Sequence, residues 1–223
     1  MTMAKNSVNG ISIQTLKRLP LYLKYLESKQ SEGIEYISMP AIAKDLEYGQ
    51  VLVKKDLTSV ISESGKPKIG HKVDFLIDEI KEFLGYNDCS KAVLVGAGQL
   101  GKALMGYKGF ESANLEIELA FDNSPFIIGE RINNIEIMDV RRMFDLCERL
   151  NVHIGIITVN EKDAQTVCNN MIDAGIKAIW NFAPIQLKVP KGIIVENVNL
   201  ASSLAVLSLK LSQKIENNKG DIK

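Results

Sequence analysis

The segment KAVLVGAGQLGKALMGYKGF, residues 91–110, limits the possible folds of this chain more than any other part of the sequence. Its apolar run AVLV ends at Gly96, and Gly98 and Gly101 complete a G-x-G-x-x-G spacing. This spacing between a strand and a helix is typical of a turn that holds a dinucleotide pyrophosphate at a helix N-terminus. The segment therefore predicts an α/β unit with a nucleotide site at this turn.

Residues 86–200 continue the same alternation of strand and helix. Apolar runs typical of buried parallel strands are AVLV, LEIELAF, HIGIITV, KAIWNF and GIIVENV. Helices are expected at QLGKALMGY, DVRRMFDLCERL and EKDAQTVCNNMIDAG. Because crossovers between parallel strands are right-handed, the alternation predicts a Rossmann-like, doubly wound parallel sheet. The tail within residues 201–223 reads as a helix that is apolar on more than one face, which indicates a subunit interface.

The second expected strand ends in ELAFD, which places Asp122 about 20 residues after Gly101. A carboxylate there accepts hydrogen bonds from the adenosine ribose and repels a 2′-phosphate. Asn123 and Ser124 follow without an arginine, so we expect NAD(H) rather than NADP(H). A tight glycine turn that binds coenzyme A in the same fold remains an alternative.

Residues 1–85 have a helical rhythm instead. Leucines recur at spacings of three and four along the first expected helix, at Leu16, Leu19, Leu23 and Leu26. Pro20 is expected to kink or divide that helix. Ser38 precedes Met39 and Pro40 as an N-cap, and Gly85 closes a fourth helix, DFLIDEIKEFLG. With the helix QVLVKKDLTSVIS and the hairpin SGKPKIGHKV between them, this is the order of a winged helix-turn-helix.

Lysines gather on the expected recognition helix and wing. Residues 50–72 contain five of them, Lys54, Lys55, Lys66, Lys68 and Lys72, against Asp56 and Glu63, in a chain whose formal net charge is zero. Such a local excess favours binding to nucleic-acid phosphates. A solvated helix face with a flexible loop is the other interpretation of the same pattern.

Several classes of protein are disfavoured. No apolar run approaches the roughly 20 residues that span a bilayer, and the opening MTMAKNSVNG lacks the apolar core of a secretory signal. Cys89, Cys147 and Cys168 form no C-x-x-C pair, which fits a reducing cytoplasm and argues against structural zinc. We therefore expect a cytoplasmic protein with no membrane and no metal partner.

Hydride-transfer chemistry usually needs an acid or base near the reacting carbonyl. His153 falls in a strand run and is expected in the core or at a strand edge, while His71 falls in the wing. Glu161, Lys162 and Asp163 follow a strand end and could act as an acid or base, but a capped helix N-terminus explains them equally well. The sequence favours a protein that reads a dinucleotide, with a small NAD-dependent oxidoreductase as the alternative.

At this point the chain resembles the Rex family of redox-sensing transcriptional repressors, over roughly residues 11–213. The motifs that carry the resemblance are KRLPLYLKYL, VKKDL, VGAGQLGKAL, GYKGF, AFDNSPFIIG, DAGIKAIWNFAP and LKVP. The resemblance implies a homodimer with an N-terminal winged helix, a Rossmann domain and a C-terminal helix exchanged between subunits. It further implies binding to operator DNA when NAD⁺ prevails and release when NADH binds, usually at fermentation and respiration genes.

The motifs and the resemblance together name the expected site residues. Those for the cofactor are Gly96, Ala97, Gly98, Gln99, Leu100, Gly101, Asp122, Thr158, Asn181, Phe182, Ala183 and Pro184, the last four on the nicotinamide side. Those for DNA are Lys54, Lys55, Thr58, Lys66, Lys68 and His71. Arg18, Tyr107 and Asn199 are implied to belong to the redox switch.

The chain departs from the family pattern in three places. The wing segment TSVISESGKPKIGHKV replaces the family's aromatic-Gly element and Gly-x-Gly-Tyr wing. This departure predicts a different operator, with an NAD(H)- or CoA-binding Rex-like protein that has lost DNA recognition as the alternative. Val159, Asn160 and Glu161 replace a Val-Pro-Ala strand end. Asn199 replaces the aspartate before the last helix, so a pairing with Arg18 would lose its charge and the redox response should be weaker.

Overall fold

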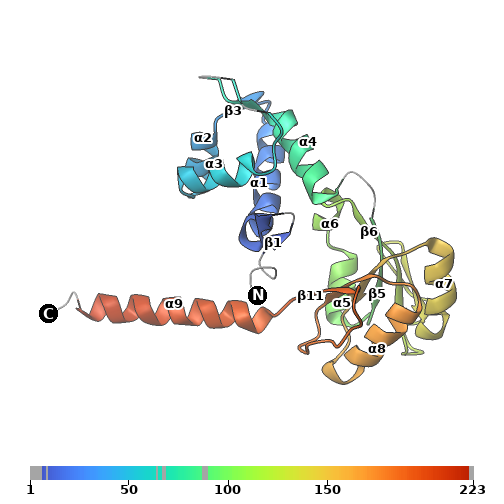
Figure 1. Cartoon of the computed structure of the whole chain (residues 1–223). Helices are drawn as coiled ribbons and strands as arrows, with labels where there is room; N and C mark the ends of the chain where they lie inside the picture. The colour runs from blue at the N-terminus through green and yellow to red at the C-terminus, as the bar shows by residue number, and fades with distance from the viewer. Residues whose placement is uncertain (1–6, 9, 64, 67–68, 87–89, 221–223) are drawn as a thin grey trace. The chain divides into compact units, whose positions relative to one another are not determined.

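The structure is a computed structural model that describes residues 7–8, 10–63, 65–66, 69–86 and 90–220. Within it the chain divides into two compact units (Figure 1). The first unit comprises Met1–Cys89 with Glu111–Asn114, and the second comprises Ser90–Phe110 with Leu115–Lys223.

The first unit contains four helices among its described residues: α1 (Ile13–Ser31), α2 (Met39–Asp45), α3 (Gln50–Thr58) and α4 (Val73–Leu84). Two short antiparallel pairs join β1 (Ser7–Val8) to β2 (Ile11–Ser12) and β3 (Tyr36–Ile37) to β4 (His71–Lys72). An isolated bridge between Lys66 and Gly70 closes the wing. The predicted winged helix-turn-helix order is confirmed.

The core of this unit follows the leucine spacing of α1. Leu19, Leu23 and Leu26 are buried against apolar side chains of the other three helices, while Leu16 is half-buried. Pro20 lies inside α1 and is exposed, so the helix continues through it without a boundary, and the alternative of a kink stays a prediction. Such a helix gives up the hydrogen bond that a backbone N–H at this position would donate.

Helix ends follow the predicted capping residues. The Ser38 hydroxyl accepts a hydrogen bond from the Ala41 N–H at 3.3 Å, and Gly85 ends α4 with a left-handed φ of 71°. Glycine adopts that conformation without a steric penalty. Both predicted caps are confirmed, and they fix the positions of the helices on either side of the wing.

The second unit contains a sheet with seven strands in the described part of the chain. Their spatial order is β11 (Ile194–Asn197), β10 (Ala178–Asn181), β9 (Ile154–Ile157), β5 (Ser90–Val95), β6 (Leu115–Asp122), β8 (Ile135–Asp139) and β7 (Arg131–Ile132). Only β7 is antiparallel to its neighbour among them. Without β7 the order is 3-2-1-4-5-6, which is the Rossmann arrangement.

Helices cover both faces of this sheet. Val93 and Val95 pack with side chains of α7 (Met143–Leu150) and α8 (Glu161–Asp173), next to the short 3₁₀ helix η1 (Val140–Arg142). Ala92 and Leu94 face the other way, toward α5 (Gln99–Met105) and α6 (Gly109–Ser112). The predicted doubly wound sheet is confirmed, although the strands β7 and β8 were not predicted.

The last helix, α9 (Leu200–Gly220), drawn in red in Figure 1, exposes its apolar side chains. Leu204, Leu207 and Leu211 are 63%, 63% and 57% exposed. The helix begins at a cap, since the Asn199 side-chain oxygen accepts a hydrogen bond from the Ser202 N–H at 3.0 Å. Across the described residues, neither α9 nor any other helix is long and apolar enough to cross a membrane.

Candidate nucleotide and nucleic-acid sites

A pocket of about 400 Å³ opens at the carboxyl ends of the central strands. Val95 and Gly96 reach it from the end of β5, Thr158 from the end of β9 and Asp122 from the end of β6. Chain order reverses between β5 and β9, and nucleotides bind at such a switch point in open α/β sheets. The pocket is therefore placed where a Rossmann fold holds its cofactor.

Each of the three motif glycines has a different environment. Gly96 has a φ of 105°, a conformation that side chains rarely adopt, and a Cβ there would meet the Thr158 and Val159 backbone at 2.9 Å. A Cβ on Gly101 would lie 2.0 Å from the Gly96 carbonyl oxygen. At Gly98 a Cβ would meet nothing within 4 Å, so this backbone faces open space in the pocket. Gly98 is thus the position at which a phosphate can approach closely.

Asp122 connects the pocket to the glycine turn. One carboxylate oxygen accepts a hydrogen bond from the Ala97 N–H and the other accepts one from the Ser124 N–H, both at 2.8 Å. The side chain stays half-exposed in the pocket wall. Because a carboxylate oxygen has more than one lone pair, both oxygens can still accept hydrogen bonds from ribose hydroxyls.

Thr158 links the two strands that border the pocket. Its hydroxyl lies 2.7 Å from the Gly96 carbonyl oxygen and 3.1 Å from that of Val95, and it donates to this pair. The contact holds the end of β9 against the glycine turn. The motif glycines, Asp122 and Thr158 are therefore brought together, with Ala97 buried behind the turn and Gln99 and Leu100 exposed on the first turn of α5.

One wall of the pocket was missed by sequence reasoning. Polar residues on one face of α8 line it, together with Val140 and Val159: Asn160, Asp163, Thr166 and Asn170. Their spacing of three, three and four residues was available as a signal, since it marks one face of a helix. Asn160 also caps α8 by accepting a hydrogen bond from the Asp163 N–H at 3.1 Å.

The first unit carries a groove of about 530 Å³ between the helix-turn-helix and the wing. Lys54 of α3 and Lys66 and His71 of the wing line it, along with Ser38 and Val51. The described residues of its lining include no aspartate or glutamate. A groove with this charge, beside an exposed face of α3, has the electrostatics of a nucleic-acid interface.

The other predicted DNA-binding residues differ in their placement. Lys55 and Thr58 are exposed on α3 outside the groove lining, and the Thr58 hydroxyl donates back to the Lys54 carbonyl at 2.6 Å. Lys68 lies outside the described residues. The His71 ring is half-buried, and burial lowers its pKa below the ordinary value. Burial thus favours the neutral form of the His71 imidazole in the groove lining.

Known proteins resemble this chain along nearly all of its length. A family model described as CoA binding domain matches residues 87–185, and one described as putative DNA-binding protein N-terminus matches residues 10–58. The redox-sensing transcriptional repressor Rex of Treponema denticola is 39% identical over 95% of this chain and 100% of its own length. The Rex of Clostridioides difficile is 38% identical over 92% of this chain and 97% of its own length.

The chain belongs to the Rex family of redox-sensing transcriptional repressors. Solved structures of a Rex-family repressor, RSP, share its fold at 32% identity. RSP with beta-NAD⁺ and operator DNA gives a TM-score of 0.85 over 95% of this chain and 97% of that chain. RSP with beta-NADH gives a TM-score of 0.83 over 95% of this chain and 99% of that chain.

The nicotinamide-side residues implied by the Rex resemblance do not line the pocket described above. Asn181 is fully buried, and its amide nitrogen donates to the Ile185 carbonyl at 2.8 Å and to the Asn197 side-chain oxygen at 2.9 Å. Ala183 is buried and Pro184 is exposed. Asn181 thus organises the chain after β10, and a direct contact between these residues and nicotinamide stays a prediction.

A chain of aromatic rings connects two segments that the Rex resemblance singled out. Tyr107 contacts Phe110, with ring centroids 5.0 Å apart, and Phe110 contacts Trp180 at 5.8 Å. Trp180 contacts Phe182 at 4.8 Å. The segment of Tyr107, implied to belong to the switch, is therefore packed against the strand end implied to face nicotinamide.

Arg18, the other implied switch residue, is held inside the first unit. Its guanidinium donates to both carboxylate oxygens of Asp56 on α3, at 2.6 and 2.9 Å. The Tyr22 hydroxyl and the Thr15 hydroxyl donate to the same carboxylate at 2.8 and 3.0 Å. Asp56 is only 2% exposed. This cluster, which we call the Asp56 cluster, fixes α1 to α3 and was not predicted.

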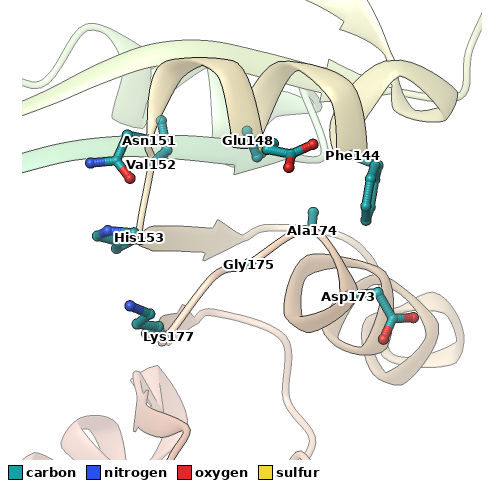
Figure 2. A pocket seen from close by; sticks show the side chains of 10 residues that line it. Phe144, Glu148, Asn151, Val152, His153, Asp173, Ala174, Gly175 and Lys177 are labelled. Carbon is teal, nitrogen blue, oxygen red and sulfur yellow. The ribbon is translucent and has the colours of Figure 1, made fainter.

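A second pocket, of about 280 Å³, lies near the amino ends of the strands β9 and β10 (Figure 2). His153 and Lys177, which line it, directly precede β9 and β10 and so mark the amino ends of these strands. Cofactors in this fold bind at the carboxyl ends. His153, predicted in the core or at a strand edge, is exposed just before the amino end of β9. It lies at the opposite end of the strands from the nucleotide pocket, away from any substrate bound there.

Proposed function

We propose that this protein is a dimeric transcriptional repressor that reads the NADH/NAD⁺ ratio, holding operator DNA with NAD⁺ and releasing it when NADH binds. One observation carries the proposal: this chain of the Rex family has both a pocket with Asp122 at the switch point of the sheet and a groove lined by lysines. RSP was solved with beta-NAD⁺ and operator DNA and with beta-NADH, which supports the same ligands here.

The test begins with a duplex selected by the protein from a randomised DNA library. Its affinity for the labelled duplex is measured by fluorescence anisotropy with NAD⁺, NADH, NADPH and coenzyme A, each over the same concentration range. NADH should weaken binding and NAD⁺ should preserve it. Equal affinities in NAD⁺ and NADH, at concentrations that saturate the pocket, would contradict the redox function.

Coenzyme A is the competing ligand, because the matched family model carries its name. The ribose of coenzyme A bears a 3′-phosphate, whereas the ribose of NAD(H) bears free hydroxyls. Asp122 lines the pocket, and we assign it to the ribose, because a carboxylate accepts hydrogen bonds from hydroxyls and repels a phosphate. We therefore expect NADH to raise the thermal midpoint of the second unit and coenzyme A to leave it unchanged.

We assign residues 1–85 to DNA binding, 86–200 to NAD(H) binding and 201–223 to dimerisation. The exposed leucines of α9 support the last assignment, since long apolar helices rarely remain bare in water. Light scattering should give twice the 24.7 kDa chain mass, and substitution of Leu204, Leu207 and Leu211 by glutamine should give the chain mass itself.

We further propose that the protein has no catalytic activity and acts in the cytoplasm, where operator DNA lies. The titratable side chains among the described residues that line the nucleotide pocket are Asp122 and Asp163. Asp122 is engaged by two backbone N–H groups, and Asp163 begins a capped helix. Consumption of NADH in the presence of small carbonyl compounds would overturn this part.

A further inference from the structure

Val51 is an apolar side chain in an unusual place. It lies in the first turn of α3 and is 83% exposed, whereas Val53 and Leu57 of the same helix are fully buried. The core of the first unit therefore gains nothing from Val51. A single exposed apolar side chain is common on a protein surface, so it is the position of Val51 in the lining of the lysine-bearing groove that indicates a contact made in the complex.

The surroundings of Val51 indicate the chemistry of its partner. The groove that it lines also holds Lys54 and Lys66, and no described residue of the lining carries a negative charge. The Lys66 ammonium is kept near the base of the wing, 5.9 Å from the centre of the Tyr36 ring. Two cations that line one groove with an apolar side chain fit a polyanion that also carries an apolar group.

Duplex DNA presents one apolar group in its major groove, the 5-methyl group of thymine. We propose that Val51 is a specificity-determining residue of this repressor, which reads the methyl group of one thymine in each operator half-site. The proposal rests on the DNA-binding function proposed above. Lys54 and Lys66 contact the phosphates on either side and contribute affinity without sequence information.

Replacement of thymine by deoxyuridine tests this inference, because it removes the methyl group and leaves base pairing unchanged. Each thymine of the selected duplex is replaced in turn, at both symmetry-related positions, and the affinity of each duplex is measured. For the native protein we expect one position at which affinity falls about fourfold per half-site, the effect of removing one buried carbon from an apolar contact.

The same series is then measured with Val51→Ala, Val51→Ile and the control Leu52→Ala, which alters a 37% exposed residue of α3 outside the groove lining. Val51→Ala should bind thymine and deoxyuridine duplexes equally at the sensitive position. Val51→Ile and Leu52→Ala should keep the difference. Urea unfolding followed by far-UV circular dichroism checks that the first unit of each variant is folded, because Val51 and Leu52 both lie in that unit.

Three results would overturn the assignment of Val51. They are a native protein insensitive to every deoxyuridine, a Val51→Ala variant that keeps the fourfold difference, and a Leu52→Ala variant that loses it. A failure of the DNA-binding function itself has a different signature, because the native protein would then select no sequence from the library.

Discussion

Two aspartates, one in each unit, show how a carboxylate serves a fold and how it serves a ligand. Asp56 is 2% exposed and accepts hydrogen bonds from three side chains, those of Thr15, Arg18 and Tyr22. Asp122 is half-exposed and accepts from two backbone N–H groups, those of Ala97 and Ser124. Both are anchored, but only Asp122 has lone pairs that face open space.

The two aspartates differ in how much of the carboxylate their hydrogen-bond partners leave accessible to a ligand. The partners of Asp56 enclose it, so its charge stabilises the contact between α1 and α3 and is hidden from solvent. Of the two partners of Asp122, Ala97 belongs to the glycine turn and Ser124 follows β6, and the carboxylate that they anchor lines the pocket proposed for NAD(H). Substitutions at the two positions should therefore separate stability from binding.

The largest effect is expected for Asp56→Ala. The change leaves Arg18, only 18% exposed, without its ion-pair partner, and breaking a buried pair in this way typically costs about 3–5 kcal/mol. Urea unfolding followed by far-UV circular dichroism should show the loss for the first unit. The fluorescence of Trp180, the chain's single tryptophan, reports the second unit and should be unchanged.

The matched control for this change is Asp45→Ala. Asp45 accepts a hydrogen bond from the Tyr25 hydroxyl at 2.7 Å, but both groups are at the surface. Exposed polar pairs contribute at most about 1 kcal/mol. Equal losses for Asp45→Ala and Asp56→Ala would show that the enclosure of Asp56 has no energetic weight.

Acid should act on the first unit through the same carboxylate. Burial alone would raise the pKa of Asp56, but the hydrogen bonds from Arg18, Tyr22 and Thr15 outweigh burial and hold that pKa below its ordinary value. Its contribution to stability is therefore complete above about pH 4 and is lost as the pH falls through the lowered pKa.

Unfolding free energies measured from pH 6 downward test this expectation. The native protein should lose stability below about pH 4, the ordinary pKa of aspartate. Asp56→Asn, which keeps the shape and cannot titrate, should be less stable at pH 6 and should lose less on acidification. Parallel curves for the two proteins would mean that other carboxylates govern the acid sensitivity.

Asp122→Ala should have the next largest effect, on binding. Loss of the acceptors for the ribose hydroxyls should weaken NADH by about 1–3 kcal/mol, the usual result of leaving polar groups unpaired. Titration by Trp180 fluorescence measures it, and Asp145→Ala, on α7 outside the pocket lining, is the control. Asp122→Asn should narrow the preference for NADH over NADPH, because the charge that repels the 2′-phosphate is gone. An unchanged preference would remove the ribose assignment.

The smallest effect is expected for Asn199→Asp. In the family pattern an aspartate at this position can pair with the arginine of the first helix, and a charged hydrogen bond exceeds a neutral one by about 1 kcal/mol. The variant should enlarge several-fold the ratio of operator affinities with NAD⁺ and with NADH. Because Asn199 caps α9 through the Ser202 N–H, and aspartate caps equally well, dimer mass should be unchanged. An unchanged ratio would leave Asn199 as a cap alone.

Much of the fold could be predicted from local patterns. The glycine turn, the apolar runs of β5, β6, β9, β10 and β11, and the caps at Ser38 and Gly85 each depend on neighbours in sequence. The strand β8 was missed because its sequence IEIMD alternates apolar with acidic residues, so it lacks the continuous apolar run of its neighbours. No boundary falls at Pro20, because the packing of α1 outweighs the loss of one backbone hydrogen bond.

The amino-acid sequence alone specifies the chemical groups of the protein and their local order: a glycine turn after a strand, an acid after the next strand, and lysines on a helix and its wing. Tertiary packing then selects which of those groups face a pocket or groove. Asn181, predicted to face nicotinamide, is fully buried. Asp56, counted in the sequence as one charge among the lysines of α3, lies at the centre of a buried cluster. One face of α8 forms a wall of the nucleotide pocket. The physical reason is that burial and hydrogen bonding depend on residues far apart in the chain, which packing alone brings together.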